Sequence, residues 1–259
     1  MSTACSLLVR AAPAWFETRR STTVEIVGVA RVPGTPWSTN GVELRISAPG
    51  GRVEAGETVP GTRLPARCPE RHVQGDRTFC LGLRRPTIDT SEVAEVWWDQ
   101  LRQYLRCQAI AVRTGVWPPA HALDHGEAGV HHERALALAE EAGLSEDYAT
   151  AWLGEPSWIT DPDLRIIDRR GDPINGRAPC PRGCRRRASR NAPVPRRKCP
   201  RRAQLAALVH AERLRREALE DYWRIVLADG TTCCRTMRAC PIRDSEDRAA
   251  EAAAGSVGR

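Results

Sequence analysis

Cys80 is the residue of this sequence with the clearest capacity for covalent chemistry. It stands in the stretch RHVQGDRTFCLGLRRP, eight residues after His72 and just beyond a turn-forming Gln74-Gly75-Asp76 run. Loops often carry reactive side chains, and nearby positive charge favours the nucleophilic thiolate. Four arginines flank the cysteine: Arg71, Arg77, Arg84 and Arg85. Because a free cysteine also packs as a small hydrophobic side chain, Cys80 is a nucleophile, a metal ligand or a structural thiol.

Six cysteines near the C-terminus have the spacing of metal ligands. They are Cys180, Cys184, Cys199, Cys233, Cys234 and Cys240. Two short-spaced groups separated by an intervening segment are typical of a four-thiolate Zn²⁺ site, which can replace the core that a small polar module lacks. The preferred ligands are Cys180, Cys184, Cys234 and Cys240, with Cys199 or Cys233 as substitutes. The alternative is a cluster of reduced cysteines or a spacing that arises from composition alone. The remaining three, Cys5, Cys68 and Cys107, are expected to be structural.

Four of the six histidines fall in the stretch HALDHGEAGVHH. His121 and His125 are four residues apart, which on a helix can place two imidazoles on one metal. Two prolines and Gly126 interrupt such a helix, so hydrogen bonding within a loop is the stronger expectation. His125 is also a candidate base, or a brace for the loop, at Cys80.

Charge and hydropathy narrow the class of protein. The formal net charge is +7. Eleven basic residues and no acidic one lie between Arg177 and Arg202. This run could contact nucleic-acid phosphates, offset the charge of a zinc–thiolate site, dock an acidic protein, or be a solvated loop.

No apolar stretch reaches the roughly 18 residues of a membrane span, and no basic region precedes the short N-terminal apolar run, as a secretory signal requires. A cytoplasmic protein with reduced thiols is expected.

The elements that position these residues can be predicted from periodicity. β-branched runs between proline and glycine clusters indicate strands over 22–32 and 41–49. A proline-punctuated, extended segment follows over 60–86. Asp89 and Glu92 form a capping pair for a helix that Gly115 ends. Its apolar positions are Val93, Val96, Trp97, Leu101, Tyr104, Leu105, Gln108 and Val112.

Further helices are predicted over 131–144, 145–154 and 204–227. After residue 244 the chain is rich in Ala, Glu and Gly, and a frayed tail is expected. The predicted domains are therefore 1–155, a basic cysteine-rich module over 156–244, and a disordered tail over 245–259.

The order of elements resembles the ubiquitin-conjugating (E2) family over roughly residues 20 to 115. In that family, strands lead through a proline-rich stretch and a His-Pro-Asn loop to a Gly-x-(Ile/Leu/Phe)-Cys-Leu segment with the acyl-accepting cysteine. LPARCPERH followed by GDRTFCLGL reproduces that order. The later WPPAHALDHGEAG and the cysteine-rich end resemble bacterial E2-like proteins with an associated cysteine-rich region. Those proteins are found beside ubiquitin-activating enzymes and JAB-type deconjugating peptidases in defence operons.

The resemblance implies an α+β fold, with an antiparallel β-meander, flanking helices and a small helical cysteine-rich module. It also implies that Cys80 takes a ubiquitin-like protein from an E1-like activating enzyme as a thioester and passes it to an amine. The family's loop asparagine corresponds to His72 here, and His72 or Gln74 could donate to the oxyanion instead. Two alternatives stay open. One is a non-catalytic E2-like scaffold whose basic zinc module binds nucleic acid or a partner protein. The other is a cysteine hydrolase with a histidine base.

Overall fold

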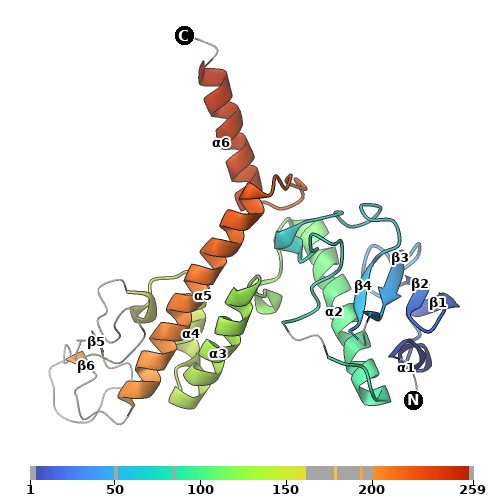
Figure 1. Cartoon of the computed structure of the whole chain (residues 1–259), viewed down its shortest axis with the longest axis horizontal. Helices are drawn as coiled ribbons and strands as arrows, with labels where there is room; N and C mark the ends of the chain where they lie inside the picture. Colours follow the sequence, from blue (N-terminus) through green and yellow to red (C-terminus); the bar gives the residue numbers. More distant parts are fainter. Residues whose placement is uncertain are drawn as a thin grey trace. The chain divides into compact units, whose positions relative to one another are not determined.

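The computed structural model describes residues 4–49, 52–83, 86–161, 178–179, 193–194 and 201–256. The chain divides into two compact units. The first combines Met1–Leu123 with the C-terminal segment Val226–Arg259, and the second is Asp124–Ile225. Figure 1 shows the elements of each unit. The last segment of the chain therefore packs with the first part of the sequence, although about a hundred residues intervene.

A four-stranded antiparallel meander forms the sheet of the first unit, in the order β1-β2-β3-β4. Its strands are β1 (Phe16–Ser21), β2 (Glu25–Ala30), β3 (Val42–Ser47) and β4 (Glu54–Glu57). In β3 the side chains Val42, Leu44 and Ile46 are buried and alternate with exposed ones, because successive side chains point to opposite faces. The predicted α+β class and the strands within 22–32 and 41–49 are confirmed.

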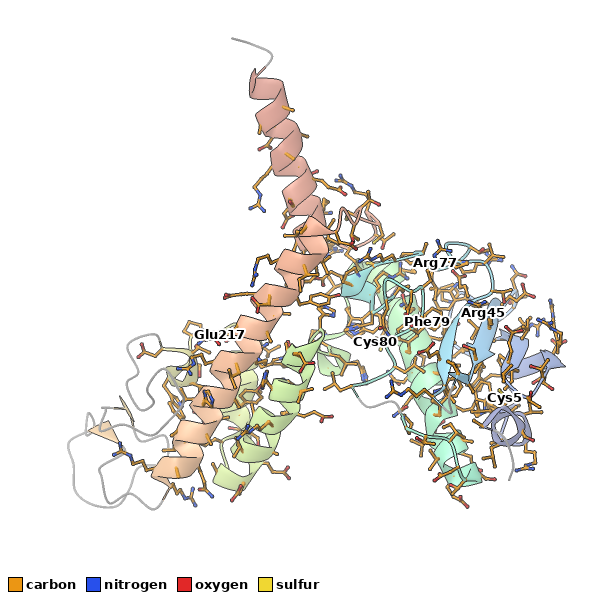
Figure 2. The ribbon with its side chains drawn as sticks, viewed as in Figure 1. Cys5, Arg45, Arg77, Phe79, Cys80 and Glu217 are labelled. Carbon is orange, nitrogen blue, oxygen red and sulfur yellow. The ribbon has the colours of Figure 1, made fainter. Side chains whose placement is uncertain are left out.

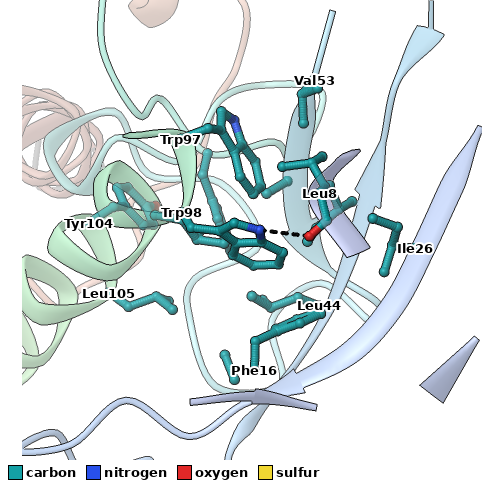
Figure 3. Close-up of a cluster of buried hydrophobic side chains, with 14 of the residues drawn as sticks. Leu8, Phe16, Ile26, Leu44, Val53, Trp97, Trp98, Tyr104 and Leu105 are labelled. Atoms are coloured by element: carbon teal, nitrogen blue, oxygen red, sulfur yellow. Dashed lines mark hydrogen bonds between the residues drawn. The ribbon is translucent and has the colours of Figure 1, made fainter. Parts of the chain in front are cut away.

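Helix α2 (Ser91–Thr114) supplies the other side of this core. Its buried residues recur at helical spacing, as predicted, and include Trp97, Trp98, Leu101, Tyr104, Leu105 and Gln108. Helix α1 (Ala4–Arg10), which the sequence pattern did not predict, packs beside it. Trp98 Nε1 donates to the Leu8 carbonyl at 3.0 Å, which satisfies the buried indole (Figure 3).

Two details of α2 differ from the prediction. The N-cap is Thr90, whose side chain accepts from the Val93 N–H, so Asp89 is not the capping residue. Val96 is 56% exposed and Val112 is also exposed, because the apolar face is narrower than the sequence pattern suggests. Gly115 ends the helix as predicted, at a φ of 69° that a residue without Cβ adopts at low cost.

The second unit is helical. It contains α3 (Glu127–Ala142), α4 (Ser145–Trp152), the 3₁₀ turn η4 (Trp158–Thr160) and most of α5 (Arg202–Ala228), with two-residue strands β5 (Ala178–Pro179) and β6 (Pro193–Val194). Alanines of α3, such as Ala135 and Ala139, pack with Tyr148, Leu205 and Leu208 in its core. These helices match the prediction, except that α3 begins four residues earlier.

The C-terminal segment corrects one expectation. Pro241–Ser256 form helix α6, where the sequence analysis expects a frayed tail after residue 244. Proline in the first turn, Asp244 near the start and a run of Ala and Glu favour the helix, and these local preferences prevail over the low apolar content. Among the described residues, no helix is both long and apolar enough to cross a membrane.

Candidate active site around Cys80

Cys80 is held between strand β4 and a loop that carries His72. Phe79 N–H donates to the Ala55 carbonyl of β4 at 2.7 Å, and Cys80 N–H donates to the His72 carbonyl at 2.8 Å. Phe79 is buried and stacks on Tyr104 of α2, with ring centroids 4.7 Å apart. The backbone that leads into Cys80 is therefore tied to the sheet and to the His72 loop, and the Phe79 ring packs on the main helix. Figure 2 labels Phe79 and Cys80.

The segment between His72 and Cys80 is a tight turn, as predicted. Val73 bridges Phe79, Gln74 N–H donates to the Thr78 carbonyl at 2.8 Å, and Arg77 N–H donates to the Gln74 carbonyl at 3.0 Å. Asp76 Oδ1 accepts from both the N–H and the hydroxyl of Thr78, at 2.9 and 2.7 Å. This turn fixes the path of the backbone into Cys80.

The Cys80 side chain is half-buried and not sealed in the core. Its Sγ lies 3.8 Å from the Gly82 carbonyl, a weak hydrogen bond. A small pocket of about 20 Å³ is lined by Phe79 and Leu81, the sequence neighbours of Cys80, and by Trp97, but not by Cys80 itself.

His72 contributes its backbone to this site and packs its ring elsewhere. It adopts a left-handed conformation with φ of 53° at the end of the 3₁₀ turn η2 (Pro69–Arg71). The imidazole is buried edge-on against Trp117, with centroids 4.8 Å apart. The role of His72 as an oxyanion donor stays a prediction, as does that of the half-buried Gln74.

A buried hydrogen-bond network lies behind the His72 loop, and the sequence analysis did not predict it. Tyr104 Oη donates towards the carbonyls of Arg71 and His72 at 3.2 and 3.3 Å. Gln108 Nε2 donates to the Arg71 carbonyl, and Arg71 Nε donates to Gln108 Oε1, both at 2.7 Å. Burial raises the pKa of Tyr104 well above its usual range, so its hydroxyl stays a donor. The His72 carbonyl therefore accepts hydrogen bonds from both the Cys80 N–H and the Tyr104 hydroxyl.

Replacing this hydroxyl tests whether it braces the Cys80 loop. Tyr104→Phe keeps the stacking on Phe79 but removes the hydrogen bonds to Arg71 and His72. We expect a loss of about 1 kcal/mol of stability and faster amide exchange at Cys80 and its loop. Urea unfolding measures the first and hydrogen–deuterium exchange the second. Equal acceleration in β2 and β3 would point to general loosening and contradict a local role.

The arginines are less concentrated at Cys80 than their spacing suggests. Arg71 is 2% exposed, and its guanidinium binds Gln108 and Thr236. Arg77 is exposed in the turn, with φ of 70°. Arg84 and Arg85 lie outside the described residues. For Arg84 and Arg85, activation of Cys80 by positive charge therefore stays a prediction. The Arg71 guanidinium is instead hydrogen-bonded to Gln108 and Thr236.

His125 belongs to the second unit. Its ring stacks on Tyr222 with centroids 4.7 Å apart and meets Trp223 edge-on. Burial lowers the pKa of His125 to about 4, so the imidazole is neutral near pH 7. His121 contacts Gln103 and accepts the Trp117 indole N–H at its carbonyl, as loop hydrogen bonding predicts. A role for His125 at Cys80 stays a prediction.

The cysteines predicted to bind zinc can be compared only in part. Cys180, Cys184 and Cys199 lie outside the described residues. Cys233, Cys234 and Cys240 are described, and they belong to the first unit together with Cys68. Across the ranges that the structure describes, no three His, Cys, Asp or Glu side chains are placed to hold a metal ion. The described part of the ligand set does not form a zinc site by itself, so the zinc prediction remains untested.

Comparison with known families identifies both parts of the chain. Residues 15–119 match the prokaryotic E2 domain, and residues 124–242 match the cysteine-rich domain that is C-terminal to E2 domains. The chain is therefore an E2-like protein with a C-terminal cysteine-rich domain. The E2 match contains the meander, α2 and Cys80, and the second match begins where the second structural unit begins. No curated protein and no solved structure matches the chain.

Proposed function

We propose that this protein is an E2-type conjugating enzyme that carries a ubiquitin-like protein as a thioester on Cys80. The observation that carries the proposal is the position of Cys80 within the E2-domain match. The cysteine is half-buried and its backbone is held by Phe79 and by the His72 carbonyl. A thiol sealed in the core would not support this chemistry, because an acyl group of protein size needs access to the sulfur.

The proposed reaction is two successive acyl transfers. The Cys80 thiolate attacks the carbonyl of a thioester on the activating enzyme, a new C–S bond forms, and the enzyme's own thiolate leaves. An amine of the acceptor then attacks the carbonyl, the Cys80 thiolate leaves, and the amine loses its proton to water or a base. Thioester exchange is nearly balanced in free energy, so the main task of the protein is to hold the carbonyl in position.

The proposed roles of the polar residues follow from this reaction. His72 and Gln74 are the candidates for a hydrogen bond to the developing oxyanion. His125 is the candidate for a base or a loop brace. The hydrogen bonds behind the loop support a rigid site, because Tyr104 donates to the His72 carbonyl that orients Cys80 and Gln108 donates to the neighbouring Arg71 carbonyl.

An E2-like domain implies two partners in general, an activating enzyme and a ubiquitin-like protein. We propose further that they belong to a bacterial conjugation system for antiphage defence, with a JAB-type deconjugating peptidase. This setting depends on the resemblance to bacterial E2-like proteins. The alternative is a non-catalytic E2-like scaffold in which the basic segment of the cysteine-rich region binds nucleic acid or a protein.

A loading assay separates these functions. The full-length protein is incubated with its activating enzyme, ATP and the ubiquitin-like protein, and products are separated on a non-reducing gel. We expect an adduct that requires ATP and that thiol reductant removes. No adduct, with an activating enzyme that loads its own cysteine, would support the scaffold. Cleavage of a peptide or isopeptide bond without ATP would support a hydrolase.

A further inference from the structure

Cys68 and Cys234 face each other within the first unit, although 166 positions separate them in the sequence. Their Sγ atoms are 3.1 Å apart. Cys68 is the N-cap residue of η2 and is 3% exposed. Cys234 lies between α5 and α6 and is half-buried, and Ala111 and Met237 complete the apolar surroundings. The pair therefore has one half-buried sulfur, at Cys234, and one buried sulfur, at Cys68.

Polar contacts place the pair beside a buried arginine. Cys234 Sγ contacts Thr236 Oγ1 at 3.1 Å, and Arg71 Nη1 donates to the same oxygen at 3.2 Å. Arg71 is buried.

We propose that Cys68 and Cys234 form a redox-active dithiol, which low-molecular-weight disulfides oxidise to a disulfide bond. The Cys234 thiol loses its proton, its sulfur attacks a sulfur of the oxidant RSSR, a mixed disulfide forms, and RS⁻ leaves. The Cys68 thiol then loses its proton and attacks Cys234 Sγ, and a second RS⁻ leaves. The two protein thiols lose two electrons, which reduce RSSR to two RSH. The sulfurs close from 3.1 Å to a bond of about 2 Å.

This bond would join the C-terminal segment to the loop of the E2 domain that leads to Cys80. Cys68 exchanges backbone hydrogen bonds with Val73, both at 3.0 Å, and the His72 carbonyl between them holds the Cys80 N–H. The inference does not depend on the proposed conjugating activity, because it concerns two other thiols and requires no partner protein.

Oxidation of the full-length protein with oxidised glutathione tests the proposal. The reduced protein is treated, its remaining thiols are alkylated, and tryptic peptides are analysed by mass spectrometry. We expect a cross-link between the peptides of Cys68 and Cys234 that dithiothreitol reverses. Cys233→Ser is the matched control, since it removes the neighbouring thiol and should leave the cross-link intact. Absence of the cross-link in the wild-type protein, or a cross-link of Cys68 to Cys233 instead, contradicts the proposal.

Two variants test the order of attack. In Cys68→Ser, Cys234 has no resolving thiol, so its mixed disulfide with glutathione should accumulate. In Cys234→Ser, Cys68 should stay unmodified, because it is buried. Modification of Cys68 alone would overturn the assigned roles.

Metal analysis of the reduced protein adds a further outcome. A zinc ion that both variants lose would make the two sulfurs metal ligands and overturn the redox assignment.

Discussion

Cys80→Ser is expected to convert the reductant-sensitive adduct with the ubiquitin-like protein into an adduct that resists reductant, and Cys80→Ala is expected to abolish it. A serine hydroxyl in place of the thiol can still accept the acyl group, but it forms an ester, which thiols do not exchange. An alanine side chain has no nucleophile. The side chain of Cys80 is half-buried and lies outside the hydrophobic core cluster, so neither change should disturb the fold. Non-reducing gels with and without reductant measure the outcome.

Cys107→Ser is the matched control for this experiment. Cys107 is also a free cysteine, but it is buried on α2, where Gln103 Nε2 lies 3.5 Å from its sulfur. Loading should be unchanged in this variant. An adduct that persists in Cys80→Ala with its sensitivity to reductant would move the acyl-accepting role to another cysteine. An adduct lost in both variants would indicate a folding defect instead.

The meander and the main helix could be predicted because their patterns are local. The alternation of Val42, Leu44 and Ile46 and the helical spacing from Trp97 to Gln108 report directly which face is buried. Glycine ends both α2 and α3 with positive φ, at Gly115 and Gly143. These signals need no knowledge of the rest of the chain.

Other elements could not be predicted because tertiary contacts decide them. In β1 only Phe16 is buried, so the strand has no apolar alternation and exists through its pairing with β2. Thr90 and Asp89 are both good cap residues, and the sequence alone does not distinguish them; in the structure Thr90 accepts from the Val93 N–H. Helix α1 is too short to be stable alone, and burial of Leu7 and Leu8 stabilises it.

The candidate site shows the same division. The turn before Cys80 is encoded by neighbouring residues and was predicted from them. The buried hydrogen-bond network behind the turn joins Arg71 to Gln108, which are 37 positions apart in the sequence. Cys68 and Cys234 are in contact although 166 positions separate them. Cys68 was therefore classed as structural, and no signal in the spacing of the cysteines indicates its partner.

A buried ionic cluster in the second unit was also missed, since its members look like ordinary surface residues of amphipathic helices. Arg215 binds both oxygens of Glu212 at 2.7 and 2.8 Å and Asp124 Oδ1 at 2.8 Å. Asp124 also contacts His132 and Trp152. Although burial opposes its charge, the hydrogen bond with Glu212 and the charge of Asp124 raise the pKa of Arg215. The positive charge of Arg215 therefore compensates the negative charges of two buried carboxylates.

Arg215→Ala is expected to destabilise the second unit by about 3–5 kcal/mol, the usual cost of leaving buried charge without its partner. Arg216→Ala is the matched control. Its side chain is 44% exposed against 6% for Arg215, and its Nε is 3.7 Å from Glu212 Oε1. That variant should lose at most about 1 kcal/mol. Urea unfolding followed by circular dichroism, with hydrogen exchange in α4 and α5, measures both.

The comparison of the two variants tests the role of the buried ion pairs. Arg215→Ala leaves the buried carboxylates of Glu212 and Asp124 without their main positive partner, whereas Arg216→Ala keeps Arg215 in place. Losses of stability that are equal in the two variants would contradict the assignment of Arg215 as the residue that compensates the buried charge.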